Sequence, residues 1–409
     1  MTLNRLTDDP RIPPGVPDIC LPRRLAYNAP GHARPRIPGP LVWSARVEFE
    51  PMAPLRIGVI GAGNVAVGHL RAYAQHPDVE IVAVSDVSTE RLAAVAQEFH
   101  IRHAFADYRQ LLALPDIQAV SVCLPNWLHA PATIEALGAG KHVLCEKPPA
   151  LTAADAQRMA DAAATADRIL MICFNYRYRN DTRFVKRLID SGQLGNLYYV
   201  KASWLRCAGI PGRQGNWFTR KALSGGGPLI DLGVHLLDLS LWLLGHPRPL
   251  SVSASTYAAF GPRGLHYTGS SPEAHNEPFE VEDLASAFIR LDNGATLLLE
   301  TSWAMHTAAG RDEYSLHLYG DQAGVEMNVR NYCTTDTVRV YRDLAGVPVD
   351  SAPHALQAGN GHAVAINDFL WCVRENRRPE ATPEQGVALM QLIEAIYRSA
   401  EQKREIALP

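Results

Sequence analysis

The sequence predicts an α/β fold with two unlike halves, and the order of its apolar segments carries this prediction. In residues 55–176, continuous apolar runs alternate with helical segments, as in a parallel sheet whose two faces are covered by helices. In residues 177–409, most apolar runs follow one another through turns, which is typical of an antiparallel sheet. A chain of 409 residues has room for two or three domains of roughly 150 residues each.

The first half contains the elements of a parallel sheet in order. Helical segments run from the first strand to about residue 76, and then over about 88–99 and 130–139. Apolar runs that read as strands occupy 56–60, 80–86, 119–125 and 141–148, and a last one begins the stretch 171–179.

The second half is richer in strands. Helices are expected at about 182–191, 225–245, 361–376 and 384–403. Asp292-Asn293-Gly294 predicts a hairpin, because these residues tolerate a positive φ. Strands are expected at 197–205, 251–260, 286–291, 295–304, 314–320, 324–329 and 337–342.

Residues 1–54 differ from the rest of the chain. They hold 11 of the 29 prolines, and proline at this density opposes packed helices and strands. Their composition predicts a disordered extension or an arm that lies on a neighbouring subunit. A third interpretation is that translation starts at Met52, because the first strand follows it at once.

Composition and charge narrow the classes of function. Lys plus Arg number 39 and Asp plus Glu 42, so no basic field exists to hold a nucleic acid. No apolar run reaches the ~20 residues that span a bilayer, and a membrane partner is not expected. The seven cysteines are scattered and form no C-x-x-C pair, as in the reduced thiols of a cytoplasmic protein.

The segment Gly61-x-Gly63-x-x-Ala66 lies where the first strand turns into a helix. Gly61 permits the tight turn, Gly63 lets a pyrophosphate approach the backbone, and Ala66 allows close packing of helix on strand. Asn64 and Val65 then begin the helix, whose free N–H groups attract phosphate. This pattern predicts a dinucleotide site.

Asp86 closes the second strand, 25 residues after Gly61. An acidic side chain at this place accepts hydrogen bonds from the adenosine ribose and repels a 2′-phosphate. The expected cofactor is therefore NAD, with NADP less favoured.

Later strands should end at the same crevice, since ligands bind beyond the carboxyl ends of parallel strands. Loops after two of these strands place Pro125, Asn126, His129, Glu146 and Lys147 near the nicotinamide. A lysine at the end of a buried strand is unusual and suits the polarisation of a substrate oxygen.

The helix within 225–245 is apolar nearly all round, except for Asp231, His235 and Asp238. Their spacing places them on one stripe, where burial is costly unless each finds a partner. Asp231 and His235 suit a general base with a carboxylate beside it. A metal site and a structural network are the alternatives. We expect no metal, because three ligands on one helix face rarely converge alone.

These motifs together resemble the Gfo/Idh/MocA oxidoreductases. The resemblance covers about residues 55–405 in order, through GAGNVAVGHL, LPNWLHA, GKHVLCEKPPALT and GGGPLIDLGVHLLDL. It implies an N-terminal Rossmann domain and a C-terminal α/β domain with a large, open, mostly antiparallel sheet. It also implies a homodimer or homotetramer formed through the open sheet face.

By matching motif, the resemblance assigns catalysis to Lys147, Asp231 and His235. It implies hydride transfer between nicotinamide and a secondary hydroxyl of a sugar, sugar derivative or cyclitol. His235 would be the general base, Lys147 would stabilise the alkoxide and could share the base role, and Asp231 would hold a neighbouring hydroxyl. The sequence also yields candidates for the sugar site: Arg177, Tyr178, Trp204, Arg206, Trp217, Trp303 and His306.

Two other functions are open at this stage. One is an NAD-retaining lyase or glycosidase that oxidises a hydroxyl transiently and then eliminates a substituent. The other is a non-catalytic NAD or sugar sensor, which should lose the acid and base groups that this chain keeps. The loop 262–282, with His266, Tyr267 and His275, is interpreted as a lid, an oligomer contact or an insertion.

Overall fold

A computed structural model describes residues 53–213, 215–269 and 278–408, and these form one compact unit. Residues 1–52 of the expected extension lie outside the described residues, and so does His275. Within the described ranges, no helix is both long enough and apolar enough to cross a bilayer.

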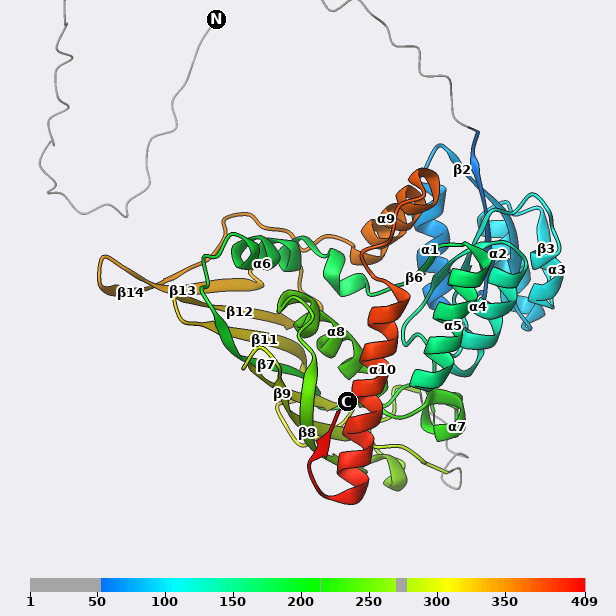
Figure 1. Cartoon of the computed structure of the whole chain (residues 1–409). Coiled ribbons are helices and arrows are strands. Elements are labelled where there is room, and N and C mark those ends of the chain that lie inside the picture. The colour runs from blue at the N-terminus through cyan, green and yellow to red at the C-terminus, as the bar shows by residue number, and fades with distance from the viewer. Residues whose placement is uncertain (1–52, 214, 270–277, 409) are drawn as a thin grey trace, which may run out of the picture. The chain divides into compact units, whose positions relative to one another are not determined.

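In the described part of the chain, the first sheet has six parallel strands in the order β3-β2-β1-β4-β5-β6 (Figure 1). The strands are β1 (Leu55–Ile60), β2 (Val79–Ser85), β3 (His103–Phe105), β4 (Ala119–Val122), β5 (His142–Cys145) and β6 (Leu170–Ile172). The helices are α1 (Asn64–Ala74), α2 (Thr89–Glu98), α3 (Tyr108–Leu112), α4 (His129–Gly138) and α5 (Ala153–Ala166).

The order of the strands reverses next to β1. The chain runs outward through β2 and β3 on one side, and through β4, β5 and β6 on the other. Ligands of such sheets bind at this reversal, beyond the carboxyl ends of the strands. The strands are continuously apolar because both of their faces are covered, and all four residues of β4 are buried.

In the described residues, the second sheet has nine strands, in the order β14-β13-β12-β11-β7-β10-β9-β8-β15. Its neighbouring strands are antiparallel except for β7 and β10. The strands are β7 (Leu197–Arg206), β8 (Pro249–Tyr257), β9 (Leu284–Leu291), β10 (Thr296–Ser302), β11 (Asp312–Gly320), β12 (Ala323–Arg330), β13 (Val338–Leu344), β14 (Val347–Ser351) and β15 (Ile406–Ala407).

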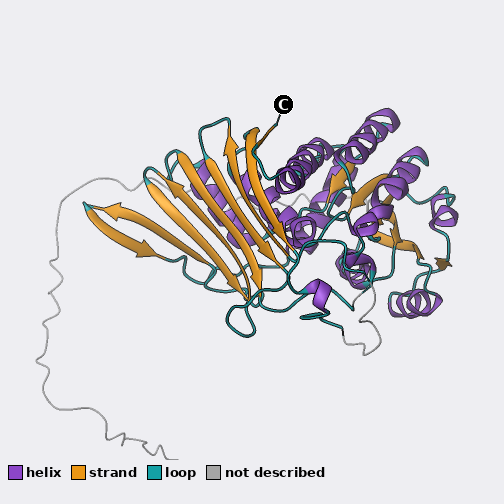
Figure 2. Cartoon of the chain, turned by 90° about the horizontal axis from the view of Figure 1, so that it is seen from below, coloured by secondary structure: helices purple, strands orange, loops and turns teal. Residues whose placement is uncertain are grey.

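Helices lie along one face of this sheet, and no helix of the described residues covers the other face (Figures 1 and 2). The helices of this half are α6 (Asn180–Asp190), α7 (Lys221–Ser224), α8 (Val234–Leu243), α9 (Gly361–Glu375) and α10 (Pro383–Gln402). Outward side chains such as Lys201 and Tyr319 are exposed, whereas inward residues such as Leu297 are buried. The predicted fold class is therefore confirmed.

The last two helices return to the first sheet. α9 packs on α1, and α10 packs on both α5 and β8. The start of α10 is fixed by a capping box, in which Thr382 and Gln385 bond each other's backbone N–H groups, with Pro383 at the first helical position. The end of the chain thus connects the two sheets.

Candidate active site

The glycine turn after β1 adopts the conformation that the sequence predicts. Gly61 has φ +112°, and a Cβ atom there would lie 2.2 Å from the carbonyl oxygen of Cys123. At Gly63, a Cβ would meet no described atom within 4 Å. Asn64 and Val65 are exposed, and no side chain caps α1. The first N–H groups of α1 therefore face open space, which fits a phosphate group.

Asp86 lies directly beside this turn. Its Oδ2 accepts the Ala62 N–H at 2.7 Å, and its Oδ1 accepts the Ser88 N–H at 2.7 Å. A carboxylate has about four acceptor positions, so two sites stay open for ribose hydroxyls. The turn, the helix end and the carboxylate together fit a nicotinamide dinucleotide.

Lys147 and Asp231 meet at the carboxyl end of the first sheet. Lys147 Nζ lies 3.1 Å from Asp231 Oδ1 and donates to the Asp231 carbonyl at 3.1 Å. Asp231 Oδ2 accepts the indole N–H of Trp303 at 2.9 Å. Burial raises the pKa of Asp231, but the charges of Lys147 and Arg206 and the Trp303 bond outweigh burial and lower it. Asp231 is therefore ionised at neutral pH.

Asp231 belongs to a π-helical turn, Leu229–Gly233, that precedes α8. The glycines before it permit close packing, since a Cβ at Gly227 would lie 1.9 Å from the Glu282 carbonyl oxygen. Glu282 in turn accepts the N–H groups of Gly227 and Leu229 at 3.0 Å each. The turn that carries Asp231 is thus held by a buried carboxylate.

His235 begins the next turn of the same helix and is buried. Its ring lies 4.7 Å from that of Tyr176 and 6.0 Å from that of Trp204, between ring centroids. Burial and the nearby charge of Lys147 hold the pKa of His235 well below its usual value. Its Nδ1 has no hydrogen-bond partner among the described residues. His235 is therefore neutral at pH 7, as a proton acceptor must be.

Trp204 and Arg206 end β7 beside these groups. Trp204 donates to Asp312 Oδ1 at 2.8 Å, and Arg206 Nε lies 3.0 Å from Asp312 Oδ2. Arg206 also donates to the Tyr332 hydroxyl at 2.6 Å, and its charge lowers the pKa of Asp231. Arg206 therefore lies near Asp231 and Trp204 near His235, and their contact with a sugar stays a prediction.

Arg177 and Asp238 form a separate pair, which corrects the expectation that Asp238 shares a stripe with the catalytic groups. Arg177 is fully buried and donates to both Asp238 oxygens, at 2.9 and 2.5 Å. Its third nitrogen donates to Gln385 at 2.8 Å. Tyr178 is also buried and donates to Asp368 at 2.8 Å. The polar groups of Arg177 and Tyr178 therefore bond to protein partners, and their contact with a sugar stays a prediction.

Three side chains expected at the cofactor bond to other parts of the protein, and their contact with a cofactor stays a prediction. The ring nitrogens of buried His129 lie 2.6 and 2.7 Å from the carbonyl oxygens of Pro148 and Leu124. Asn126 Nδ2 donates to the Ser224 carbonyl at 2.7 Å, and Glu146 is buried beside His69. The bonds of His129 and Asn126 fix the loops that follow β4 and β5. Pro125 is half-buried at the start of one of these loops.

The remaining candidates contact other aromatic side chains or the backbone. Trp217 stands edge to face against Trp127 at 5.8 Å between ring centroids, which brings the two halves of the chain together. His306 and His266 both pack on Phe260, and the Tyr267 hydroxyl donates to the Gly261 carbonyl. The described parts of the loop 262–282 are held by distant segments, because the Thr268 N–H donates to the Ile210 carbonyl and the Glu280 N–H to the Thr219 carbonyl, each at 2.9 Å.

Sequence reasoning missed Tyr176 and Tyr332, which complete the aromatic surroundings of His235 and Arg206. It also missed His69 and His362, which lie against Glu146. His69, the third residue after Ala66, gives no local signal of its role, because its partner Glu146 is 77 residues away in the sequence.

Comparison with known proteins agrees with this geometry. Residues 55–174 match a family model described as "Oxidoreductase family, NAD-binding Rossmann fold", and residues 182–326 match the GFO/IDH/MocA C-terminal domain. D-glucoside 3-dehydrogenase of Escherichia coli (strain K12) is 34% identical over 359 residues, covering 87% of this chain and 98% of that protein.

A second relative is levoglucosan dehydrogenase of Pseudarthrobacter phenanthrenivorans. It is 29% identical over 304 residues, and the match covers 71% of this chain and 76% of that protein. A solved structure of levoglucosan dehydrogenase in complex with NADH has a TM-score of 0.77 and 25% identity, with 87% of this chain and 99% of that chain covered. Because models of both domains match the chain and a relative is 34% identical over 87% of it, the chain belongs to the Gfo/Idh/MocA family of oxidoreductases.

Proposed function

We propose that this protein is an NAD-dependent dehydrogenase that oxidises a secondary hydroxyl of a sugar. The observation that carries the proposal is the grouping of a lysine, an ionised aspartate and a neutral histidine where the first sheet meets the second. Residues 55–176 form the cofactor domain, and residues 177–409 form the substrate and oligomerisation domain. D-glucosides are the first substrates to test, because a relative that covers most of the chain is a D-glucoside 3-dehydrogenase.

In the oxidation direction, His235 takes the proton of the substrate hydroxyl. The bound nicotinamide supplies the hydride acceptor. Lys147 stabilises the oxygen as its negative charge grows, because its ammonium is held toward the site by Asp231. His235 is neutral and buried, so protonation makes it an acid that returns the proton in the reverse reaction.

Asp231 has two tasks in this mechanism. Its Oδ1 orients Lys147, and its Oδ2 is fixed by Trp303. Each oxygen keeps a second lone pair, so the carboxylate can also accept a hydroxyl next to the one that is oxidised. Arg206 and Trp204 lie near enough to contact other parts of the ring, the first by hydrogen bonds and the second by its apolar face.

The proposed cofactor is NAD rather than NADP. Asp86 bonds to the glycine turn, so we expect its carboxylate to accept the adenosine ribose hydroxyls and to repel a 2′-phosphate. No described arginine or lysine has an ion pair or hydrogen bond with Asp86 that would neutralise this charge.

The proposed assembly is a homodimer or homotetramer formed through the uncovered sheet face. Four aromatic side chains are exposed there: Tyr257, Phe288, Tyr319 and Tyr341. Exposed aromatic groups are enriched at protein interfaces. Light scattering on the purified protein should give the mass of two or four chains, and charged substitutions at Phe288 and Tyr319 should reduce that mass.

The activity is tested by adding D-glucosides and NAD to the purified protein and recording NADH absorbance. Net NADH formation by the wild type, and none by His235→Ala, supports the proposal. Consumption of a glucoside without NADH would instead indicate a lyase or glycosidase that retains its cofactor. Absence of any reaction with a broad panel of sugars and cyclitols would refute an enzymatic role for sugars.

A further inference from the structure

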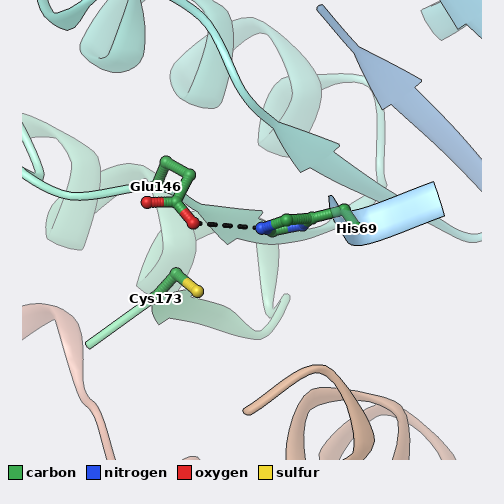
Figure 3. A group of neighbouring side chains, drawn as sticks. All are labelled: His69, Glu146 and Cys173. Atoms are coloured by element: carbon green, nitrogen blue, oxygen red, sulfur yellow. Dashed lines mark hydrogen bonds and ion pairs between the residues drawn. The ribbon is translucent and has the colours of Figure 1, made fainter. Parts of the chain in front are cut away.

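A group of polar side chains, buried except for His362, lies next to Lys147 and takes no part in the proposed chemistry. Glu146 Oε1 is 3.0 Å from His69 Nε2 and 3.5 Å from His362 Nε2. Figure 3 shows Glu146 pointing at His69, with the Cys173 side chain beside them. We define the Glu146 cluster as His69, Glu146, Cys173 and His362.

The cluster joins four separate parts of the fold. His69 comes from α1, Glu146 follows β5, Cys173 follows β6 and His362 comes from α9. The outer ring nitrogens of the two histidines are also fixed. His69 Nδ1 lies 3.0 Å from Ser121 Oγ, and His362 Nδ1 lies 3.1 Å from the side-chain amide of Asn175.

The carboxylate of Glu146 is buried and charged. Burial raises the pKa of Glu146, but the hydrogen bonds from His362 and His69 outweigh burial and hold it well below its usual value. A buried carboxylate persists in a folded protein only where it is paired and hydrogen-bonded. Its position is therefore determined closely by the two imidazoles.

The second oxygen of Glu146 connects the cluster to Lys147. Glu146 Oε2 accepts the backbone N–H of Lys147 at 3.1 Å. The same lysine places its ammonium 3.1 Å from Asp231. The backbone from which the Lys147 side chain projects is thus bonded to a carboxylate that the two histidines hold.

We propose that Glu146, held by His69 and His362, is a positioning residue that fixes Lys147 against Asp231, and not a ligand of the cofactor. The expected change in kcat rests on the proposed function. The expected change in the position of the Lys147 side chain does not.

His69, Glu146 and Cys173 also have the chemistry of zinc ligands, and their ligand atoms lie within 4.8 Å of one another. The geometry favours the hydrogen-bonded interpretation. Both Glu146 oxygens already accept N–H groups of the protein, and burial raises the pKa of Cys173 well above its usual value, which opposes the thiolate that zinc requires.

The test compares His69→Leu, His69→Gln and His362→Ala with the wild type. Gln retains an N–H donor near the position of Nε2, whereas Leu does not. His362→Ala is a second variant that removes a bond to Glu146. The His362 side chain is 39% exposed, and its loss leaves α1 intact. His142→Gln, at the other end of β5, is the matched control.

The first readout needs no substrate: the rate at which an acylating reagent modifies Lys147, followed by peptide mass spectrometry. Lys186 is the internal reference, because it is also paired with an aspartate and its side chain is 23% exposed against 21% for Lys147. His69→Leu and His362→Ala should raise Lys147 reactivity relative to Lys186, because Nζ is released from Asp231. His69→Gln and His142→Gln should leave it near the wild-type value.

The second readout is kinetic. Misplacing a reacting group by about 1 Å can cost on the order of 100-fold, so His69→Leu should lower kcat by tenfold or more, as an order of magnitude. NADH affinity should be unchanged, and His69→Gln should restore most of the kcat.

Three results would overturn the inference. Unchanged Lys147 reactivity in both removal variants would show that the cluster does not position the lysine. Reduced NADH affinity with unchanged kcat would make Glu146 a cofactor ligand. One zinc ion per chain in purified protein, with activity lost on chelation, would make the cluster a metal site. An inactive wild type would count against the proposed function alone, since the reactivity readout is independent of turnover.

Discussion

Lys147 and Asp231 are 84 positions apart in the sequence, and their side chains meet at 3.1 Å between Nζ and Oδ1. One follows a strand of the parallel sheet, and the other lies in the π-helical turn that precedes α8. The pair therefore forms only when the two halves of the chain are correctly packed. In the proposed reaction, it supplies the positive charge that stabilises the substrate oxygen.

Replacing this lysine should abolish turnover but not cofactor binding. Lys147→Met removes the ammonium that stabilises the alkoxide, and loss of such a group costs about 10²- to 10⁴-fold in kcat. NADH fluorescence titration should give an unchanged Kd, since the glycine turn and Asp86 are untouched. Lys186→Met, which removes another aspartate-paired lysine, is the control. Wild-type turnover in Lys147→Met would exclude the lysine from catalysis.

The lowered pKa of His235 makes stability depend on pH in a defined window. The ordinary value is 6.5, and the folded value lies well below it. Between the two values only the unfolded chain binds a proton here, so stability falls as pH falls. The slope is about 1.4 kcal/mol per pH unit for one proton.

Urea unfolding of the wild type and His235→Asn therefore tests the protonation state. From about pH 6.5 to 5.5 the wild type should lose stability relative to the variant, and above about pH 7.5 the difference should be constant. His103→Asn, at an exposed position of β3, controls for the substitution itself. Parallel curves over the whole range would mean that burial does not keep His235 neutral.

Asp86 should set the preference between the two nicotinamide cofactors. Asp86→Ser removes the charge that repels a 2′-phosphate, so the ratio of kcat/KM for NAD to that for NADP should fall by on the order of tenfold, or ~1.4 kcal/mol. The ratio is the useful quantity, because the variant also loses the bonds to Ala62 and Ser88. Asp107→Ser, at the exposed cap of α3, is the control. An unchanged ratio would place the ribose elsewhere.

Arg177 and Asp238 should matter for stability and not for substrate affinity. Arg177→Met leaves a buried carboxylate unpaired, which costs about 3–5 kcal/mol. Replacing both residues, as Arg177→Met with Asp238→Leu, should recover much of that loss. Calorimetry measures the Tm of both variants. The KM for the substrate should equal that of the wild type. A raised KM at an unchanged Tm would return Arg177 to the sugar site.

Much of this arrangement can be predicted from local sequence patterns. Gly61, Gly63 and Asp86 are predictable because a dinucleotide turn needs these residue types at fixed spacing. Apolar runs locate most strands, since burial on both faces requires unbroken apolar sequence. The strands β3, β14 and β15 escape prediction. Segments of two or three residues, such as β3 and β15, have no measurable period, and β14 is exposed along most of its length.

The direction of buried polar side chains is harder to predict. The stripe of Asp231, His235 and Asp238 suggested one common function, yet Asp238 pairs with Arg177 while Asp231 pairs with Lys147. Spacing on a helix gives the angle of each side chain but not the partner that tertiary packing brings to it. The same limit hides His362, which reaches Glu146 from a helix near the end of the chain.

The measurement that tests the proposed reaction most directly is the number of NADH molecules formed per sugar oxidised. Purified protein is mixed with excess NAD and a limiting D-glucoside, and NADH and the keto product are both quantified. A dehydrogenase in which Lys147 and His235 act on a secondary hydroxyl should form one NADH for each ketone, and His235→Ala should form neither. Product without accumulated NADH would contradict this reaction, because the electrons would then have returned to the sugar.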